Sequence, residues 1–259
     1  MLTLIPDISP SRLMRGKTGQ DLQASEAFAL KRKRILLRDA HTCQGCGICL
    51  NPAENTPARG LEVHHINANP RDNRAENLVS LCGLCHGIFH IGCFARRIGS
   101  GMHVIHCPEL SQAELNLLSW AMALTLFKTQ ESQESSERLL ANKAGHLREL
   151  LLLRENFPAS YFQDAEALAT FHEKIQKAQT ISYLGTLLGM LRSRYPSCYA
   201  RRGELLGGLR IFYDPKEPLI FCDRHGKTIL ADLAASSQWE SGTDWSRTWA
   251  ILGQSLLRP

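Results

Sequence analysis

The sequence has no apolar run long enough to cross a membrane. Its most apolar stretch, residues 115–127, is interrupted by Asn116, Ser119 and Thr125, whereas a membrane-spanning helix needs about 20 apolar residues. The first residues also lack a charged start followed by an apolar run, so we expect no secretory signal. We therefore expect a cytoplasmic chain that is not inserted in a membrane.

A strong surplus of one charge is also absent. The 259 residues include 30 Lys+Arg and 25 Asp+Glu, a net charge of +5, which is too small to identify a nucleic-acid-binding protein by itself. Internal repeats and long low-complexity tracts are absent as well. Because 44% of the residues are hydrophobic, the chain can form a packed core, which excludes bulk disorder.

Cysteines, in contrast, are clustered. Two pairs with two-residue gaps lie 35 residues apart in this chain, and they are Cys43, Cys46, Cys82 and Cys85. A two-residue gap lets one turn present two thiolates to one ion, so two such turns predict a closed, tetrahedral zinc site. A closed site leaves no position for substrate, so its role is structural. Cys49 extends the first pair, and we expect it to remain outside the site.

Histidines accumulate around the same pairs. His86 and His90 are four residues apart on a predicted helix, so they share one face and can hold one cation. The predicted strand 61–66 carries His64 and His65 and can supply a third ligand. A single histidine is most often a packing residue, but this grouping favours a second metal site.

Three segments resemble the HNH nuclease family in residue type and order. They are Arg38-Asp-Ala-His-Thr-Cys43, Leu61-Glu-Val-His-His-Ile66, and Glu76-Asn-Leu-Val-Ser-Leu-Cys82 with its continuation to His90. The resemblance covers about residues 35–91. It implies a ββα-metal motif, in which two short antiparallel strands and one helix surround a divalent ion.

The resemblance also implies the roles of five residues. His64, His86 and His90 would hold the divalent ion, His65 would be the general base of phosphodiester cleavage, and Asn77 would brace the connecting loop. With a reference pKa of about 6.5, a histidine can accept a proton at neutral pH. An imidazole-rich shell suits Zn²⁺, Ni²⁺ or Mn²⁺ at least as well as Mg²⁺, so the identity of this ion stays open.

Two features of the sequence can each be interpreted in two ways. Neighbours on a regular strand point to opposite faces, so His64 and His65 serve one site only if substrate approaches beside the metal or the strand is distorted. The basic run Lys31, Arg32, Lys33 and Arg34 can contact nucleic-acid phosphates or form a solvated helix face.

A second, narrower resemblance covers about residues 38–127. The run from Asn77 to Cys85 and the string Cys107-Pro-Glu-Leu-Ser-Gln-Ala-Glu-Leu-Asn116 are similar to the DotN/IcmJ family of type IVB secretion systems. That resemblance implies a structural partner that docks on the coupling ATPase, and hence recruitment to the inner-membrane secretion complex. Members of that family can lack the metal-site histidines, whereas all four are present here.

Together these patterns predict an α+β fold: a zinc-bound HNH ββα-metal domain followed by a mainly α-helical region with a small β-hairpin. We expect a flexible lead-in (1–24), an HNH-like zinc domain (25–128), a linker (129–137) and a mainly helical C-terminal region (138–259). The C-terminal region is expected to contain helices 138–155, 164–177 and 182–195, a hairpin of strands 209–213 and 218–222, and tryptophans at helical spacing, Trp245 and Trp249.

Three functions remain open at this point. The first is a zinc-stabilised HNH-fold component of a type IVB secretion or conjugal-transfer coupling complex, with the coupling ATPase as its partner. The second is a free-standing HNH endonuclease that hydrolyses DNA, and both can hold together. The third is a zinc-dependent DNA-binding protein without cleavage.

Overall fold

The computed structural model describes residues 2–8, 26–50, 59–92, 94, 101–130, 134–155, 181–223 and 226–235. Its elements are mixed helices and short strands, and the strands form two separate two-stranded sheets. The α+β fold expected from the sequence is therefore confirmed. None of the helices in the described part of the chain combines the length and apolarity that a bilayer crossing requires.

The first sheet is the ββ part of a ββα unit. Strands β1 (Leu61–His65) and β2 (Leu78–Cys82) pair antiparallel, with Leu61 opposite Cys82 at one end of the ladder. Helix α3 (Gly83–Phe89) follows directly from β2 because Cys82, in an extended conformation, is its N-cap. The short 3-10 helix η3 (Ala75–Asn77) leads into β2.

Helix α2 (Glu26–Arg38) packs on this hairpin. It buries Ile35 and Leu36, and its last residue fastens it in place. The Arg38 guanidinium donates to the carbonyl oxygens of Ala75 and Leu78, each at 2.8 Å. The end of α2 is thereby fixed against both ends of η3.

The second sheet corrects one expectation. Strand β4 (Leu209–Tyr213) does not form a hairpin with residues 218–222 but pairs antiparallel with β3 (Met102–His106). Residues Pro218–Phe221 form the 3-10 helix η7. The physical reason is Pro218, which has no N–H to donate to a strand ladder and is suited to the first turn of a helix.

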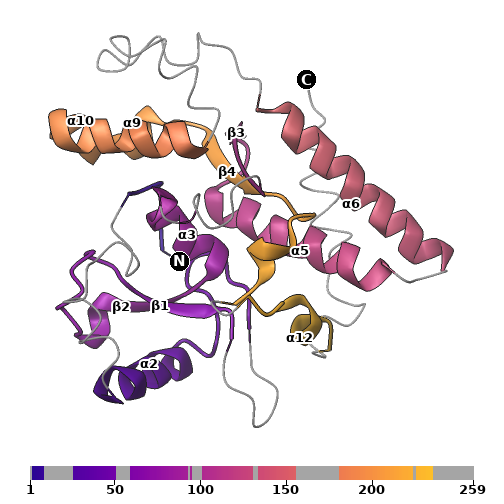
Figure 1. Ribbon diagram of the computed structural model, residues 1–259, viewed down its shortest axis with the longest axis horizontal. Coiled ribbons are helices and arrows are strands. Elements are labelled where there is room, and N and C mark those ends of the chain that lie inside the picture. Colours follow the sequence, from indigo (N-terminus) through magenta and orange to yellow (C-terminus); the bar gives the residue numbers. More distant parts are fainter. Residues whose placement is uncertain are drawn as a thin grey trace.

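Helix α5 (Gln112–Thr129) runs through the middle of the molecule, between α3 and α6 (Ser135–Leu153) (Figure 1). Its start is the capping box expected from the sequence, since the Ser111 side chain accepts from the Glu114 N–H and the Glu114 carboxylate accepts from the Ser111 N–H. Between α5 and α6, the structure describes helix up to Thr129 and again from Ser135.

Helices α9 (Ile181–Arg194), α10 (Pro196–Ala200), α11 (Arg202–Leu205) and α12 (Leu230–Ala235) complete the described elements. The helix expected at 182–195 is therefore present, almost residue for residue. The expected helix 164–177 and the segment with Trp245 and Trp249 lie outside the described residues. One core joins the parts on both sides of the expected linker, because Leu81, Leu184 and Ile211 belong to one buried cluster.

The amino-terminal segment 2–8, expected to belong to a flexible lead-in, packs against the rest of the chain. Leu4 is buried, and Asp7 exchanges backbone hydrogen bonds with the end of α3, donating to Ile88 and accepting from Ile91. The Asp7 carboxylate also pairs with Arg202 at 3.0 Å. These contacts link the end of α3 to α11.

An ion pair joins α6 to the end of β4, and it leads to a prediction. The Arg148 Nε and Nη2 atoms donate to the two Asp214 carboxylate oxygens at 2.7 and 2.6 Å. Burial alone would raise the pKa of Asp214, but the hydrogen bonds from Arg148 and from the Lys216 N–H, together with the charge of Arg148, outweigh it and hold the pKa below its usual value. Replacement D214N should lower the free energy of unfolding by about 1.5–3 kcal/mol in urea titrations near pH 7.

The replacement E149Q is the matched control, because Glu149 contacts the same guanidinium but is exposed. It should change the free energy of unfolding by less than about 0.5 kcal/mol. Since the pKa of folded Asp214 is lowered, its contribution is present above the unfolded-state pKa and is lost as the pH falls through the folded-state value. A D214N effect that does not shrink in acid would contradict this account.

Candidate metal centres

The first candidate centre is a cluster of the four predicted cysteines. Cys43 and Cys46 lie in the turn after α2, Cys82 ends β2 and Cys85 lies in α3; all four are buried, and their Sγ atoms lie within 4.8 Å of one another. The Sγ atoms of Cys46 and Cys82 are 3.7 Å apart. Zn–S bonds of about 2.3 Å place neighbouring sulfurs of a tetrahedron about 3.8 Å apart, so the donor set fits zinc.

Glycines allow the first cysteine turn to close over the second. A Cβ atom at Gly45 would lie 3.0 Å from the Cys85 Sγ atom, and Gly47 has φ +81° while its N–H donates to the Cys43 carbonyl at 2.9 Å. Side chains would be strained at both positions. Cys49 lies outside the cluster, as expected, with its Sγ atom 3.8 Å from the Ala40 carbonyl oxygen.

The charge state of the cluster favours a bound cation. Hydrogen bonds from Cys46, Cys82 and Cys85 lower the pKa of Cys43, whereas burial raises the pKa of Cys82 and Cys85 well above the usual value. Four thiolates in an apolar interior need a compensating charge, and a divalent metal ion supplies it. The donor chemistry and the burial of the cluster therefore both favour a bound metal ion.

The second candidate centre is formed by three histidines. His64 from β1 meets His86 from α3 and His90 just after α3, with ring nitrogens within 4.8 Å of one another. The ring centroids of His86 and His90 are 4.5 Å apart, and those of His64 lie 5.3 and 5.6 Å from them. Three imidazoles at these separations can hold one divalent ion.

The surroundings of these histidines suit ligands. Burial, reinforced by His86 and His90, lowers the pKa of His64 to about 2, so His64 is neutral near pH 7 and has a nitrogen lone pair for a metal. Glu62 lies with its Oε2 atom 3.0 Å from the His86 Nδ1 atom, the carboxylate–histidine arrangement that orients metal-binding imidazoles. Phe89 stacks on His64 with ring centroids 4.5 Å apart. Sequence reasoning missed both Glu62 and Phe89.

His65 does not join the histidine cluster. Strand β1 is a regular ladder up to its end, with His65 opposite Leu78, so His64 and His65 point to opposite faces. The His65 Nε2 atom lies 3.0 Å from the Asn73 Oδ1 atom, and Phe28 of α2 stacks on its ring. Because an amide oxygen only accepts, this contact suits the tautomer that donates from Nε2, in which Nδ1 carries the lone pair.

Asn77 ties together the loop between β1 and β2. Its Nδ2 atom donates to the Asn67 Oδ1 atom at 2.9 Å and to the Asp72 carbonyl at 2.8 Å, and its Oδ1 atom accepts from the Asn67 N–H at 3.0 Å. Asn77 is buried. These bonds hold the polar loop that also carries Asn73, the hydrogen-bond partner of His65.

Two comparisons of the sequence with known proteins find similarities. The HNH endonuclease family model matches residues 55–81, which include β1, Asn77 and most of β2. "Type 4 apparatus protein DotN" of Legionella pneumophila subsp. pneumophila (strain Philadelphia 1) is 32% identical over 97 residues. The chain therefore resembles DotN over part of its length and contains a segment similar to HNH endonucleases.

Both matches cover only part of the chain. The DotN match covers 36% of this chain and 40% of the relative, so the chain spans about two fifths of DotN. The HNH match ends before Cys82, His86 and His90. Both centres of this DotN-like chain therefore rest on their geometry, and the resemblances predicted from the sequence are confirmed at the level of the HNH domain and the DotN relative.

The four basic residues of α2 differ in their contacts and exposure. Lys31 donates from Nζ to the Asn73 carbonyl at 2.7 Å, and Arg32 donates to the Leu61 carbonyl at 2.8 Å. Both therefore fasten α2 to the ββα unit. Lys33 and Arg34 are exposed, and only these two fit the expected surface for nucleic-acid phosphates.

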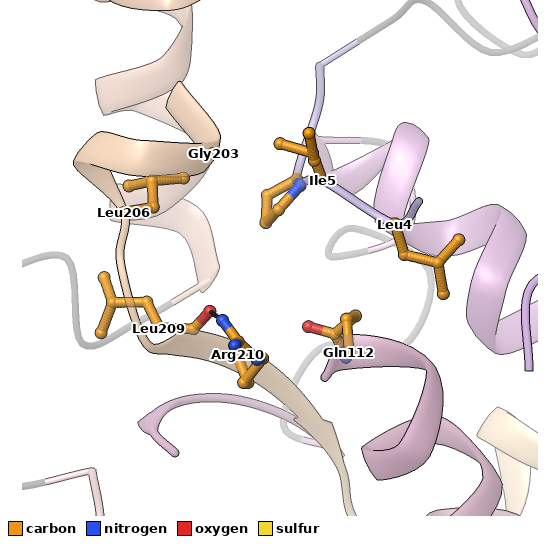
Figure 2. Close-up of a pocket in the computed structure, with 8 residues that line it drawn as sticks. Leu4, Ile5, Gln112, Gly203, Leu206, Leu209 and Arg210 are labelled. Carbon is orange, nitrogen blue, oxygen red and sulfur yellow. Dashed lines mark hydrogen bonds between the residues drawn. The ribbon is translucent and has the colours of Figure 1, made fainter. Parts of the chain in front are cut away.

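A cavity lies elsewhere, between the amino-terminal segment and the start of β4 (Figure 2). Leu4 and Ile5 face it from the segment, and Leu209 and Arg210 face it from β4. Its volume of about 50 Å³ admits water molecules rather than a nucleotide. None of the candidate cysteines and histidines lines it.

Proposed function

We propose that this DotN-like protein is a zinc-stabilised HNH-fold component of a type IVB secretion or conjugal-transfer coupling complex. The observation that carries the proposal is the 32% identity to the type 4 apparatus protein DotN, together with the four-cysteine cluster. In this role the protein is cytoplasmic, is recruited to the inner-membrane secretion complex and docks on the coupling ATPase. Cys43, Cys46, Cys82 and Cys85 hold the structural zinc.

Co-purification tests this function. The tagged protein, expressed at its natural level in cells that make the whole apparatus, should recover the coupling ATPase in a fixed ratio. A strain without the ATPase is the control, and in it the tagged protein should lose the remaining coupling components. Recovery of the tagged protein alone from cells with the complete apparatus would contradict the proposal.

A second function is supported by the histidine cluster: metal-dependent cleavage of DNA phosphodiester bonds. In it His64, His86 and His90 hold one divalent ion, Mg²⁺, Mn²⁺, Ni²⁺ or Zn²⁺. When bound, this ion supplies Lewis-acid chemistry at the scissile phosphate and support for the leaving oxygen. The neutral state of His64 and the Glu62 contact of His86 support the proposal. A protein that serves only as a structural partner does not need these histidine features.

His65 supplies the base of this reaction, in which the substrate lies beside the metal because the regular strand β1 directs His65 away from the three ligands. Its Nδ1 atom removes a proton from the attacking water, while Asn73 holds the Nε2 proton and so selects the productive tautomer. Asn77 positions the loop that carries Asn73. Lys33 and Arg34, exposed on α2, contact the DNA backbone.

Metal content tests the second centre separately from the first. Replacement H90A should lower the bound divalent metal from two ions per chain to one, measured by elemental analysis after equilibration with Zn²⁺. The exposed His146 of α6 provides the control, and H146A should retain both ions. If the wild-type protein holds only one ion per chain, or H90A still holds two, the histidine site is not a metal site.

A further inference from the structure

The string Ser111-Gln-Ala-Glu-Leu-Asn116, which the resemblance to DotN singled out, has no role in either metal centre as described so far. Its residues begin α5, the helix that lies between the ββα unit and the second sheet. Gln112 and Asn116 are amides among the mostly apolar buried residues of this helix, with 5% and 0% exposure. Buried amides need hydrogen-bond partners, and theirs lead to the cysteine cluster.

Two side chains of α5 donate hydrogen bonds to the sulfurs. The Asn116 Nδ2 atom lies 3.3 Å from the Cys85 Sγ atom, and the Trp120 Nε1 atom lies 3.5 Å from the Cys82 Sγ atom. A third donor is the Cys82 backbone N–H, 3.2 Å from the Cys43 Sγ atom. Asn116 and Trp120 are one helical turn apart, so one face of α5 supplies both side-chain donors.

The orientation of the Asn116 amide follows from the backbone of β4. The Ile211 N–H donates to the Gln112 Oε1 atom and the Gln112 Nε2 atom donates to the Ile211 carbonyl, both at 2.8 Å. These bonds fix which end of the Gln112 amide is nitrogen. The second Nε2 hydrogen is directed to the Asn116 Oδ1 atom, also at 2.8 Å, so the Asn116 NH₂ group faces Cys85.

We infer that Asn116 and Trp120 are outer donors of the cysteine-bound zinc, and that Gln112 makes the orientation of the Asn116 amide depend on strand β4. Donation to a thiolate lowers its electron density, so each N–H reduces the tendency of the sulfur to be protonated or to leave the metal. Removal of such outer partners of a metal ligand typically costs 10–100-fold in metal affinity. The zinc centre and the second sheet are thereby joined through one helix face.

This inference rests on the proposed zinc site, and two measurements test it. The first is the rate at which an excess of a chromophoric chelator removes zinc from the full-length protein. The second is the sulfur-to-metal charge-transfer band of the Co²⁺-substituted protein, which reports electron density on sulfur. Replacement N116L, close in shape but without donors, should accelerate zinc release 10–100-fold and shift the band to lower energy.

Two further variants separate hydrogen bonding from packing. W120F keeps an aromatic ring against Phe221 but removes the indole N–H, and it should shift the band in the same direction. Q112L touches no cysteine and should still accelerate zinc release, because Asn116 loses the bond that orients it. The control is S119A, at a fully buried residue of α5 whose hydroxyl has no hydrogen-bond partner among the described residues; it should leave both readouts unchanged.

The outcomes distinguish the inference from the proposed zinc site. A wild-type protein without stoichiometric metal would overturn both. A metal-bound wild type, with N116L and W120F that keep its release rate and band energy, would overturn the inference alone. An equal effect of S119A would also overturn it, because packing would then explain the changes. If N116L does not fold, the band position of W120F decides.

Discussion

Replacement of His65 by alanine is expected to lower the rate of metal-dependent plasmid cleavage by about 10²–10⁴-fold, the usual contribution of a general base. The expectation follows from the position of this imidazole at the end of β1, where Asn73 leaves the Nδ1 lone pair available for a proton. Nicking of supercoiled plasmid, measured with Mg²⁺, Mn²⁺, Ni²⁺ and Zn²⁺ in turn, provides the rate.

A base and a metal ligand can be told apart in the same experiment. His65 lies outside the histidine cluster, so H65A should keep the wild-type metal content while it loses activity, whereas H90A should lose both. H146A should retain the wild-type rate. Equal survival of the plasmid with wild type and H65A under all four ions would show that the histidine centre does not cleave DNA and would leave the secretion role to be tested by co-purification.

The second large effect is expected from the cysteine cluster. Replacement C82S should prevent cooperative folding, because structural zinc supplies roughly 10–16 kcal/mol of apparent binding free energy, whereas domains of this kind have stabilities of about 5–15 kcal/mol. Cys82 is fully buried and ends β2 at the start of α3. Circular dichroism and urea unfolding of the variant, beside the wild type with and without a strong chelator, measure the loss.

The matched control is C49S. Cys49 belongs to the same cysteine-rich turn but not to the cluster, so C49S should unfold at the urea concentration of the wild type. A C82S protein with the unfolding midpoint and slope of the wild type would show that the four sulfurs do not hold a stabilising ion. If both variants were destabilised equally, the loss of stability would come from a disturbed turn rather than from the lost metal.

Spacing in the sequence was enough to predict the local parts of both centres. The two-residue gaps bring each cysteine pair into one turn, and the four-residue gap places His86 and His90 on one helix side, because these distances depend only on backbone geometry. Strand 209–213 was also predicted, from its short run of apolar and aromatic residues. Its partner was not, since strand pairing is decided by residues far apart in the chain, and Pro218 also suits the first position of a helical turn, which is where the structure places it.

The residues that surround the centres were harder to predict. Asn73 lies in a loop with several other polar residues, and nothing in the loop sequence distinguishes the one that meets His65. Glu62 was more accessible to prediction, because it precedes His64 by two positions and so shares its face of the strand. Gln112 and Asn116 also carried a signal, since two amides four residues apart on an apolar helix require buried partners.

The amino-terminal segment has a consequence for the order in which the protein is assembled. Ile8 forms a β-bridge with His90, while Asp7 is held by Arg202, 195 positions later in the sequence. A ribosome releases residue 202 only after the histidine and cysteine centres have already emerged. The contacts beside His90 are therefore completed only late in synthesis, and a fusion partner attached ahead of Met1 would be placed close to that late step.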